Sequence, residues 1–290
     1  MTMKKKNCLH VSLVIPAYNE ESHLAACLEA IAHQTVQPYE VIVVDNNSSD
    51  QTIAIACRYP FVKILHESRQ GVVFARNTGF NAARGDIIGR TDGDSILAPD
   101  WIAQVQRTFA NPSVEAASGI VTYRDIGLRQ TFGAIDSLVR HYLAKRMSLI
   151  DELFLYGVNM AVRREAWEAV RGNVCHDRHL HEDLDLAIHM AKQRQRIVFA
   201  PTMQASISPR QASANSREFS KYVWSNPRVY AEHGMVAQRY MYPIALFVVS
   251  LYLPIRFLYR GYNPDTQRFS LMRALTVTPP VRPSPISESL

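Results

Sequence analysis

Residues 11–20 read VSLVIPAYNE, an apolar run that gives way to a polar segment at Tyr18. The same arrangement recurs at residues 41–50, VIVVDNNSSD, and at residues 86–95, DIIGRTDGDS. Short continuous runs of Val, Ile and Leu are typical of strands in a parallel sheet, because such strands are buried on both faces. Segments of helical character separate these runs, and the alternation predicts an α/β fold with helices on both faces of the sheet.

The connecting segments carry a helical repeat. Apolar residues recur at three- or four-residue spacing after the first strand, at Leu24, Cys27, Leu28 and Ile31. We expect Asn19 and Asp50 to cap the first two helices. The further predicted strands lie at 62–65, 119–123, 157–162 and 197–200, the last closed by Pro201, and the further helices lie at 72–83, 131–147, 182–193 and from Arg164 onward.

Polar residues follow three of the predicted strands at the point where each strand ends. In parallel α/β sheets, ligands bind beyond the carboxyl ends of the strands, so these residues are expected to meet at one edge. Tyr18 and Glu20 can flank a nucleobase or bond to its ribose, and Asp45 can accept a hydrogen bond from a base N–H. A capping contact for Tyr18 and an N-cap role for Asp45 are the structural alternatives.

Asp92-Gly93-Asp94 follows the strand that ends near Arg90. Two carboxylates one residue apart can hold a hard divalent cation, and Mg²⁺ prefers a few carboxylates together with substrate phosphate oxygens. Gly93 lets the backbone turn sharply and lets a ligand approach. An Asx-rich turn has the same composition, so this motif gains weight only from the other two strand ends.

Four motifs, in this order and spacing, closely resemble the family-2 glycosyltransferases with a GT-A fold. They are SLVIPAYNEE at 12–21, VVDNNSSD at 43–50, ARNTG at 75–79 and TDGD at 91–94. The resemblance covers residues 10–205 and implies a nucleotide-sugar donor, a divalent cation (Mg²⁺ or Mn²⁺) and a single-displacement transfer with inversion. By position it implies that Pro16, Tyr18, Glu20 and Asp45 line the nucleoside pocket, that Arg76 approaches the nucleotide or its phosphates, that Asp92 faces the ribose or donor sugar, and that Asp94, with Asp92, holds the metal.

An acidic pair, Glu182-Asp183, lies about 90 residues after the paired aspartates. An inverting transfer needs one base to take the proton of the acceptor hydroxyl. The resemblance implies that Asp183 is this base, with Glu182 a weaker candidate and Asp185 a bystander. The alternative is an ordinary helix start, where acidic side chains are stabilised by the helix dipole.

Two further residues are weaker site candidates. Asn159 lies in a strand that resembles the family's acceptor side, where it could touch a sugar; a buried amide beside a tight turn is the alternative. The family often has an additional metal-binding histidine after the strand that ends near Pro201, but residues 201–232 contain none. Arg210 occupies this region and could neutralise a departing diphosphate. His176, His179 and His181 lack metal-ligand spacing, so no zinc site is expected among them.

The end of the chain differs in charge from the rest. Residues 1–209 carry 22 basic and 22 acidic side chains, whereas residues 210–290 carry 10 basic and 4 acidic ones. An uncharged stretch, Tyr240 to Ile255, would span about 24 Å as a helix, short of the ~30 Å hydrocarbon core of a bilayer. Pro254 is expected to interrupt its end. An in-plane segment on an anionic membrane and an internal helix remain open.

The resemblance and the composition together predict a series of segments. These are a flexible N-terminus at 1–9, a GT-A catalytic domain at 10–205 with a nucleotide-binding half at 10–95 and an acceptor half at 96–205, a helical basic extension at 206–278 with membrane association as one expectation, and a disordered tail at 279–290. The expected acceptor is a saccharide or a lipid-linked saccharide used in cell-envelope synthesis.

Composition and missing motifs exclude several other classes of protein. Apolar residues make up 47% and charged residues 20%, as in globular proteins. There is no CxxC pair and no secretory apolar run, so a cytoplasmic location is expected, with the inner face of the cell membrane as one option. GxGxxG is absent, which argues against a nicotinamide dehydrogenase, and the basic tail lacks the interleaved aromatics of nucleic-acid binding. A sugar nucleotidyltransferase and a non-catalytic binding protein of the same fold remain the alternatives.

Overall fold

The computed structural model describes residues 9–123, 155–207, 216–236, 238–263, 266 and 268–276. The elements up to the middle of the chain are β1 (Val11–Ala17), α1 (Leu24–Ala32), β2 (Glu40–Asp45), α2 (Thr52–Ala56), β3 (Val62–His66), α3 (Val72–Ala82), β4 (Ile87–Thr91), β5 (Ser95–Leu97), α4 (Trp101–Phe109) and β6 (Ala116–Tyr123). The later elements are β7 (Asn159–Arg163), α6 (Arg164–Val170), α7 (Glu182–Lys192), β8 (Ile197–Ile207), α8 (Ser216–Glu232), α9 (Gln238–Gly261), β9 (Tyr262–Asn263), β10 (Arg268–Phe269) and α10 (Leu271–Thr276).

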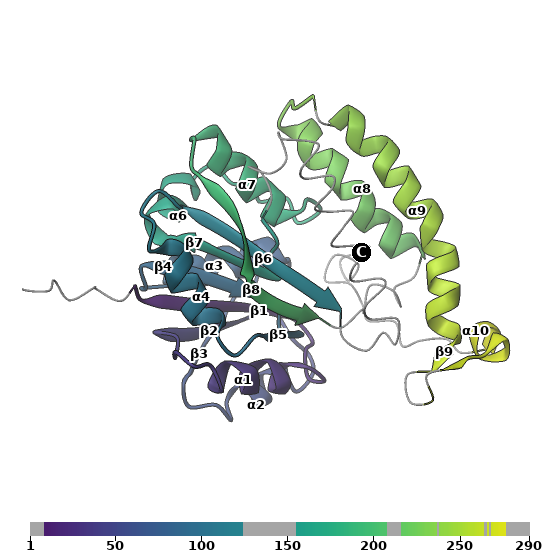
Figure 1. Cartoon of the computed structure of the whole chain (residues 1–290), viewed down its shortest axis with the longest axis horizontal. Coiled ribbons are helices and arrows are strands. Elements are labelled where there is room, and N and C mark those ends of the chain that lie inside the picture. The colour runs from purple at the N-terminus through teal and green to yellow at the C-terminus, as the bar shows by residue number, and fades with distance from the viewer. Residues whose placement is uncertain are drawn as a thin grey trace, which may run out of the picture.

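An eight-stranded sheet forms the centre of the molecule, with the order β3-β2-β1-β4-β7-β6-β8-β5 (Figure 1). The first four strands of the chain run parallel to one another, and β6 runs parallel to β8. Strand β7 is antiparallel to both of its neighbours, β4 and β6, and β5 is antiparallel to β8. The mostly parallel α/β sheet is therefore confirmed, with an inverted strand in its middle.

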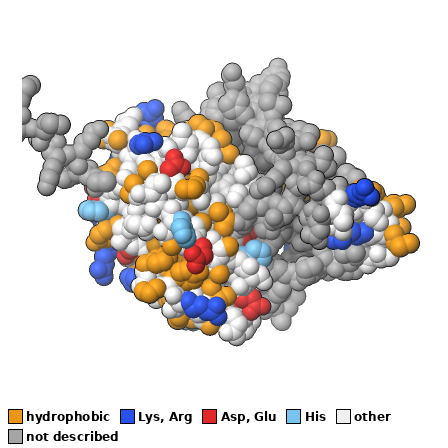
Figure 2. Space-filling model, turned by 60° about the horizontal axis from the view of Figure 1, so that its bottom comes forward, with side chains coloured by type: hydrophobic (Ala, Val, Ile, Leu, Met, Phe, Trp, Pro, Cys, Tyr) orange, Lys and Arg blue, Asp and Glu red, His pale blue; other side chains and the backbone are white. Residues whose placement is uncertain are grey.

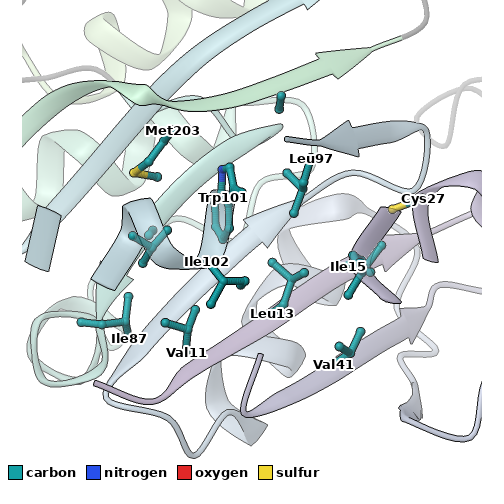
Figure 3. Close-up of a cluster of buried hydrophobic side chains, with 14 of the residues drawn as sticks. Val11, Leu13, Ile15, Cys27, Val41, Ile87, Leu97, Trp101, Ile102 and Met203 are labelled. Atoms are coloured by element: carbon teal, nitrogen blue, oxygen red, sulfur yellow. The ribbon is translucent and has the colours of Figure 1, made fainter. Parts of the chain in front are cut away.

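Side chains of each central strand alternate between two cores. Leu13 and Ile15 pack with Trp101 of α4 on one face (Figure 3), and α1 and α2 belong to the same core. Val14, between them, packs on the other face with Phe80 of α3 and with α6 and α7. Because both faces are covered, the strands need apolar side chains at every position, which explains the continuous apolar runs. This confirms helices on both faces.

The two expected helix caps have different outcomes. Helix α1 begins at Leu24, and Asn19 has a left-handed backbone (φ 51°), so the expectation of an Asn19 cap is wrong. The Asn19 side-chain oxygen instead accepts the backbone N–H of Ser49 at 2.9 Å, which joins the loops after β1 and β2. Asp50 accepts the backbone N–H of Thr52, the first residue of α2, at 2.9 Å, but it does so from one residue before the N-cap position, which is Gln51.

Strand β8 continues past Pro201 to Ile207, so the expected end at Ala200 is wrong. Its pairing with β6 shifts register at this point: Ser118 faces Phe199, and Ile120 faces Gln204. Pro201 lies in the skipped segment, where the missing N–H removes no ladder hydrogen bond. The register shift thus lets the strand carry a proline.

The last helices extend to one side of the sheet (Figure 1). Leu184 and Ile188 of α7 pack against Val229 and Tyr230 of α8. Helix α9 packs along α8 and continues through Pro254. The expectation that Pro254 interrupts this helix is therefore wrong. Pro254 is exposed, so a carbonyl freed by the proline can bond to water.

Helix α9 bears on the question of a membrane crossing. Within the described part of the chain, no helix combines the length and apolar character that a membrane crossing requires. The expected helix at 131–147, Arg210 and the expected tail at 279–290 lie outside the described residues.

Candidate active site

The sheet order brings the predicted site segments to one edge. Ala17 at the end of β1 faces Asp45 at the end of β2, and the backbone N–H of Asn46 donates to the carbonyl of Ala17 at 2.9 Å. Strand β4 lies on the other side of β1 and leads into Asp92-Gly93-Asp94. The antiparallel strand β7 starts at this same edge, where Asn159 faces Thr91. Polar segments from four strands therefore meet here.

The predicted nucleoside residues surround the ends of β1 and β2. Pro16, Tyr18, Glu20 and Asp45 are buried or nearly so. Asp45 accepts the backbone N–H of Ser48 at 3.1 Å, and its other oxygen lies 3.2 Å from Nδ1 of His66. His66, which ends β3, was not predicted, because the pairing of β2 with β3 alone brings it beside Asp45.

Glu20 connects the first strand to the paired aspartates. A Cβ placed on Gly93 would lie 2.9 Å from Cγ of Glu20, closer than such contacts ordinarily come. Gly93 is therefore needed for the turn between the two aspartates to lie against Glu20. The backbone N–H of Glu20 donates to the Thr52 hydroxyl at 2.7 Å, which fixes this loop to α2.

The Asn46 amide holds the loop that follows β3. Its nitrogen donates to the carbonyl oxygens of Glu67 and Arg69, and its oxygen accepts the backbone N–H of Gly71 at 2.7 Å. Gly71 has a φ of 142°, a conformation that side-chain-bearing residues rarely adopt. The loop from 67 to 71 is thus held by one buried side chain next to Asp45.

Three carboxylates crowd together beyond β4. One third of the Asp92 side chain is exposed, and Asp94 and Asp183 lie close enough to affect its titration. Burial, then the negative charges of Asp94, Glu182 and Asp183, raise the pKa of Asp92 to about 6, against the opposing effect of Arg90. Such a cluster is costly without a counter-charge. It is therefore suited to a cation.

Asp183 lies at the start of α7 and faces the paired aspartates. One carboxylate oxygen accepts the backbone N–H of Gly157 at 3.0 Å, and the other accepts the N–H of Leu184 at 2.8 Å. These two amides, one from the loop before β7 and one from the helix, set the direction of the carboxylate. The side chain is half-buried, so a ligand can reach it.

Glu182, the preceding residue, points into the protein. Its carboxylate accepts a hydrogen bond from Arg90 at 2.6 Å, and its backbone carbonyl accepts one from Arg76 at 3.2 Å. Burial opposes ionisation, but Arg90 and Arg76 hold the pKa of Glu182 below its ordinary value. Arg90 also donates to Asp92 at 3.3 Å, so it links the interior to the exposed carboxylates.

Arg76 does not lie where the resemblance implied. Its side chain is fully buried, and its guanidinium lies over the rings of Phe80 and Trp167. Burial lowers its pKa to about 10, so it stays charged at neutral pH. The structure places it behind Glu182, away from any open surface, because Glu182 needs a buried counter-charge. Arg90, which sequence reasoning missed, was signalled by a lone charge within the buried strand β4.

Asn159 also has a different environment from the one expected. Its amide nitrogen donates to the carbonyl oxygens of Ile120 and Met203, and its oxygen accepts the indole N–H of Trp101 at 2.7 Å. The side chain is fully buried and bonded within the sheet at the β6–β8 register shift. It supports the sheet beneath the site and has no open face toward a sugar.

The half-buried carboxylate cluster fits a hard divalent cation. Asp92 and Asp94 offer carboxylate oxygens as ligands. Oxygen-only ligand sets with one or two carboxylates suit Mg²⁺ and Mn²⁺, which take their remaining ligands from water and phosphate. The raised pKa of Asp92 is consistent with carboxylates that a cation would relieve.

Sequence comparisons agree with this geometry. The profile described as "Glycosyl transferase family 2" matches residues 12–171. The chain is 37% identical over 102 residues to the putative glycosyltransferase EpsH of Bacillus subtilis, covering 34% of this chain and 30% of EpsH. It is 38% identical over 120 residues to the glycosyltransferase AglE of Haloferax volcanii, covering 39% and 40%. The chain thus spans well under two thirds of the length of these curated relatives.

Solved structures show the same fold. The mannosyltransferase PcManGT of Pyrobaculum calidifontis, solved with GDP-Man and Mn²⁺, superposes with a TM-score of 0.59 at 23% identity, covering 90% of this chain and 78% of PcManGT. S. aureus TarS, solved with UDP-GlcNAc, gives a TM-score of 0.58 at 17% identity, covering 77% and 66%. At these identities the likeness establishes the fold.

Proposed function

This chain belongs to glycosyl transferase family 2 and has the GT-A fold, and we propose that it moves a sugar from a nucleotide donor to a hydroxyl acceptor. The transfer would invert the anomeric configuration of the sugar and would require a divalent cation. The supporting observation is the group of three carboxylates, Asp92, Asp94 and Asp183, at the edge where β1, β2 and β4 end. Asp92 and Asp94 would face the cation and the donor, and Asp183 would face the acceptor hydroxyl.

The donor nucleoside would lie over the ends of β1 and β2. Asp45 would accept a hydrogen bond from the base, with Tyr18 and Pro16 beneath it and Glu20 at the ribose. Asn46 and the loop from 67 to 71 would set the depth of this pocket. The nucleotide sugars in PcManGT and TarS support a donor of this class here. We place the diphosphate next to Asp92 and Asp94, where the cation would neutralise its charge as the nucleotide leaves.

Asp183 would act as the base. The acceptor oxygen forms a bond to the anomeric carbon as the bond from that carbon to the diphosphate oxygen breaks, and the hydroxyl proton passes to Asp183. The nucleoside diphosphate leaves with the bonding electrons. The hydrogen bonds from Gly157 and Leu184 orient the carboxylate while leaving lone pairs for the proton. Arg90 would hold Asp92 in place through its hydrogen bond.

The acceptor would be a saccharide or a lipid-linked saccharide of the cell envelope, at the cytoplasmic face of the membrane. Helices α9 and α10 support this placement, because they expose large apolar side chains: Leu246, Phe247, Leu271, Met272 and Leu275, of which Met272 is 75% exposed. Figure 2 shows hydrophobic and basic side chains together at the far end of the molecule. Such a surface suits the headgroup region of an anionic bilayer.

The decisive experiment pairs donor binding with product analysis. UDP-, GDP- and dTDP-sugars would be titrated with Mn²⁺ by calorimetry, and the best donor would be offered to saccharide acceptors. We expect saturable binding and a product whose anomeric configuration is opposite to that of the donor, seen by NMR. Formation of a nucleotide sugar from a nucleoside triphosphate and a sugar phosphate would instead show a nucleotidyltransferase. Binding without any turnover would favour a non-catalytic relative.

A further inference from the structure

Helix α7 carries a second group of polar side chains on the side that faces α8. The group joins Asp185 and His189, one helical turn apart, to Cys175 before the helix and to His233 just after α8. One ligand atom from each residue lies within 4.8 Å of all the others. The Asp185 side chain is 1% exposed and that of His233 is 6% exposed. These residues are therefore enclosed by the protein.

The donor atoms converge on one carboxylate. Oδ1 of Asp185 lies 2.9 Å from Nε2 of His233 and 3.5 Å from Nε2 of His189. The other Asp185 oxygen accepts the backbone N–H of Cys175 at 2.9 Å, which draws the cysteine toward the histidines. The two imidazole rings are 4.8 Å apart and nearly perpendicular. Their nitrogens thus meet at a common point rather than stacking away from it.

One of these nitrogens makes no hydrogen bond within the described part of the chain. Nε2 of His189 is buried and makes no hydrogen bond to any of the residues that the structure describes. Buried polar atoms are nearly always hydrogen-bonded, so an exception calls for an explanation. A ligand seated between His189, His233 and Asp185 would supply the missing bond.

We propose that Cys175, Asp185, His189 and His233 form a structural zinc site. A thiolate, two imidazoles and a carboxylate are ligands that Zn²⁺ takes in tetrahedral sites, and four protein ligands leave no open position for catalysis. Soft sulfur and imidazole ligands disfavour Mg²⁺ and Mn²⁺, which the oxygen ligands of Asp92 and Asp94 suit. The two sites would thus hold different metals.

Binding requires two local changes. The Cys175 thiol proton leaves to solvent as the sulfur takes the metal, and the ring proton of His233 moves through solvent from Nε2 to Nδ1 as Nε2 takes the metal. Lys192 lies 2.9 Å from Nδ1 of His233, and it must turn to solvent once that nitrogen carries the ring proton. The contact is exposed, so the lysine has room to turn.

The site would join the proposed catalytic helix to the C-terminal helices. Helix α7 begins beside Asp183, and Leu184 and Ile188 already pack against Val229 and Tyr230 of α8. A metal bound by His233 would fasten the end of α8 to the same helix and to the loop that precedes it. This inference depends on the geometry of α7 and α8 and does not rest on sugar transfer.

Metal analysis and cobalt substitution test the proposal in the full chain. Protein purified without chelator should carry one zinc per chain, and the chelator-treated protein should take up Co²⁺ with visible bands of a tetrahedral ion and a thiolate-to-cobalt charge-transfer band. Cys175→Ser should abolish the charge-transfer band, and His233→Ala should weaken metal binding by more than about 100-fold, since loss of a direct ligand exceeds the effect of outer-shell changes.

Matched variants keep the test specific. Cys57→Ser changes an exposed free thiol, and His179→Ala changes a nearby histidine outside the group, so both should leave the cobalt spectrum and stoichiometry unchanged. Asp94→Asn should also leave the charge-transfer band intact, which separates this site from the proposed Mn²⁺ site. A wild-type chain that binds Co²⁺ without a charge-transfer band, or a band that persists in Cys175→Ser, would overturn the proposal.

Discussion

Two sets of charged side chains meet at the carboxyl edge of the sheet, and they differ in burial. Arg76, Glu182 and Arg90 form a buried interior row, in which Arg90 donates to the Glu182 carboxylate at 2.6 Å and Arg76 donates to the Glu182 backbone carbonyl at 3.2 Å. Asp92, Asp94 and Asp183 form a carboxylate cluster just outside it, where like charges crowd. Arg90 bonds to both sets through Glu182 and Asp92.

The difference separates residues that support the site from residues that face a ligand. Buried charges persist only when they are paired, so the interior row can hold the architecture but cannot exchange partners with a substrate. In the carboxylate cluster Arg90 reaches Asp92 at 3.3 Å, and a cation would relieve the like charges that crowd there. Glu182 and Asp183 are neighbours in sequence, yet the start of α7 directs Glu182 into the interior row and Asp183 into the carboxylate cluster.

The largest expected effect comes from the carboxylate cluster. Asp94→Asn should abolish metal-dependent transfer and donor hydrolysis while the protein stays folded, because the residue lies at the surface edge of the sheet. Asp86→Asn, at the opposite end of β4, is the matched control and should keep nearly full activity. Turnover would be measured with Mn²⁺ and with EDTA. Wild-type activity of Asp94→Asn in EDTA would contradict the metal-dependent account.

Damage to the interior row should appear as lost stability. Glu182→Ala leaves Arg90 buried with only part of its counter-charge, and removal of one partner of a buried pair costs about 3–5 kcal/mol. Glu168→Ala breaks the exposed pair with Arg164 and should cost about 0.3–0.5 kcal/mol. Urea unfolding would give both values. Equal small losses for the two variants would show that the Arg90 pair does not support the fold.

The pH dependence of stability and of Mn²⁺ affinity should depend on the protonation of Asp92. Its pKa is raised from 3.8 to about 6, so without metal the folded protein binds more protons than the unfolded chain between these values, and this group's contribution to stability falls as pH rises through the window. A cation competes with the proton, so Mn²⁺ affinity should rise by up to about tenfold per pH unit below pH 6 and level off above it. Calorimetric titration at several pH values would show this. A flat profile from pH 5 to pH 7 would contradict the crowding of the cluster.

The smallest effect is expected from the apolar surface of α9, which lies far from the interior row and from the carboxylate cluster. Leu246→Gln with Phe247→Gln on α9 should reduce co-sedimentation with anionic liposomes and leave solution turnover on a short acceptor unchanged. Phe61→Gln, an exposed aromatic of the sheet domain, is the control and should sediment like the wild type. If neither the wild type nor the variants sediment at low salt, the apolar surface does not serve membrane binding.

The carboxylate cluster was more predictable than the interior row. Asp92 and Asp94 directly follow β4, Asp45 ends β2, and the rule that parallel strands end at one edge brings these two strand ends together. Arg90, Asn159 and Arg76 depend on the antiparallel strand β7, on the β6–β8 register shift and on the packing of α3 against α7. These are contacts between segments distant in sequence, and neither strand periodicity nor a motif encodes them.

The same limit explains the group on the other side of α7. Asp185 and His189 are one helical turn apart, but His233 joins them only because α8 packs on this helix, and Cys175 joins them through the hydrogen bond from its backbone N–H to Asp185. His233 lies one residue beyond the range in which a histidine ligand was sought, and the structure places it against Asp185 and Lys192.

The central claim is that Asp183 takes the acceptor proton while the other residues bind and support, and Asp183→Asn tests it most directly. The amide keeps the shape of the side chain but cannot accept the proton, and base catalysis typically contributes 10²–10⁴-fold, so kcat should fall at least about 100-fold. Donor and Mn²⁺ affinities, measured by calorimetry, should stay within a fewfold of the wild type. A variant with near wild-type turnover would contradict the account, and one that no longer binds the donor would place Asp183 in the sugar pocket instead.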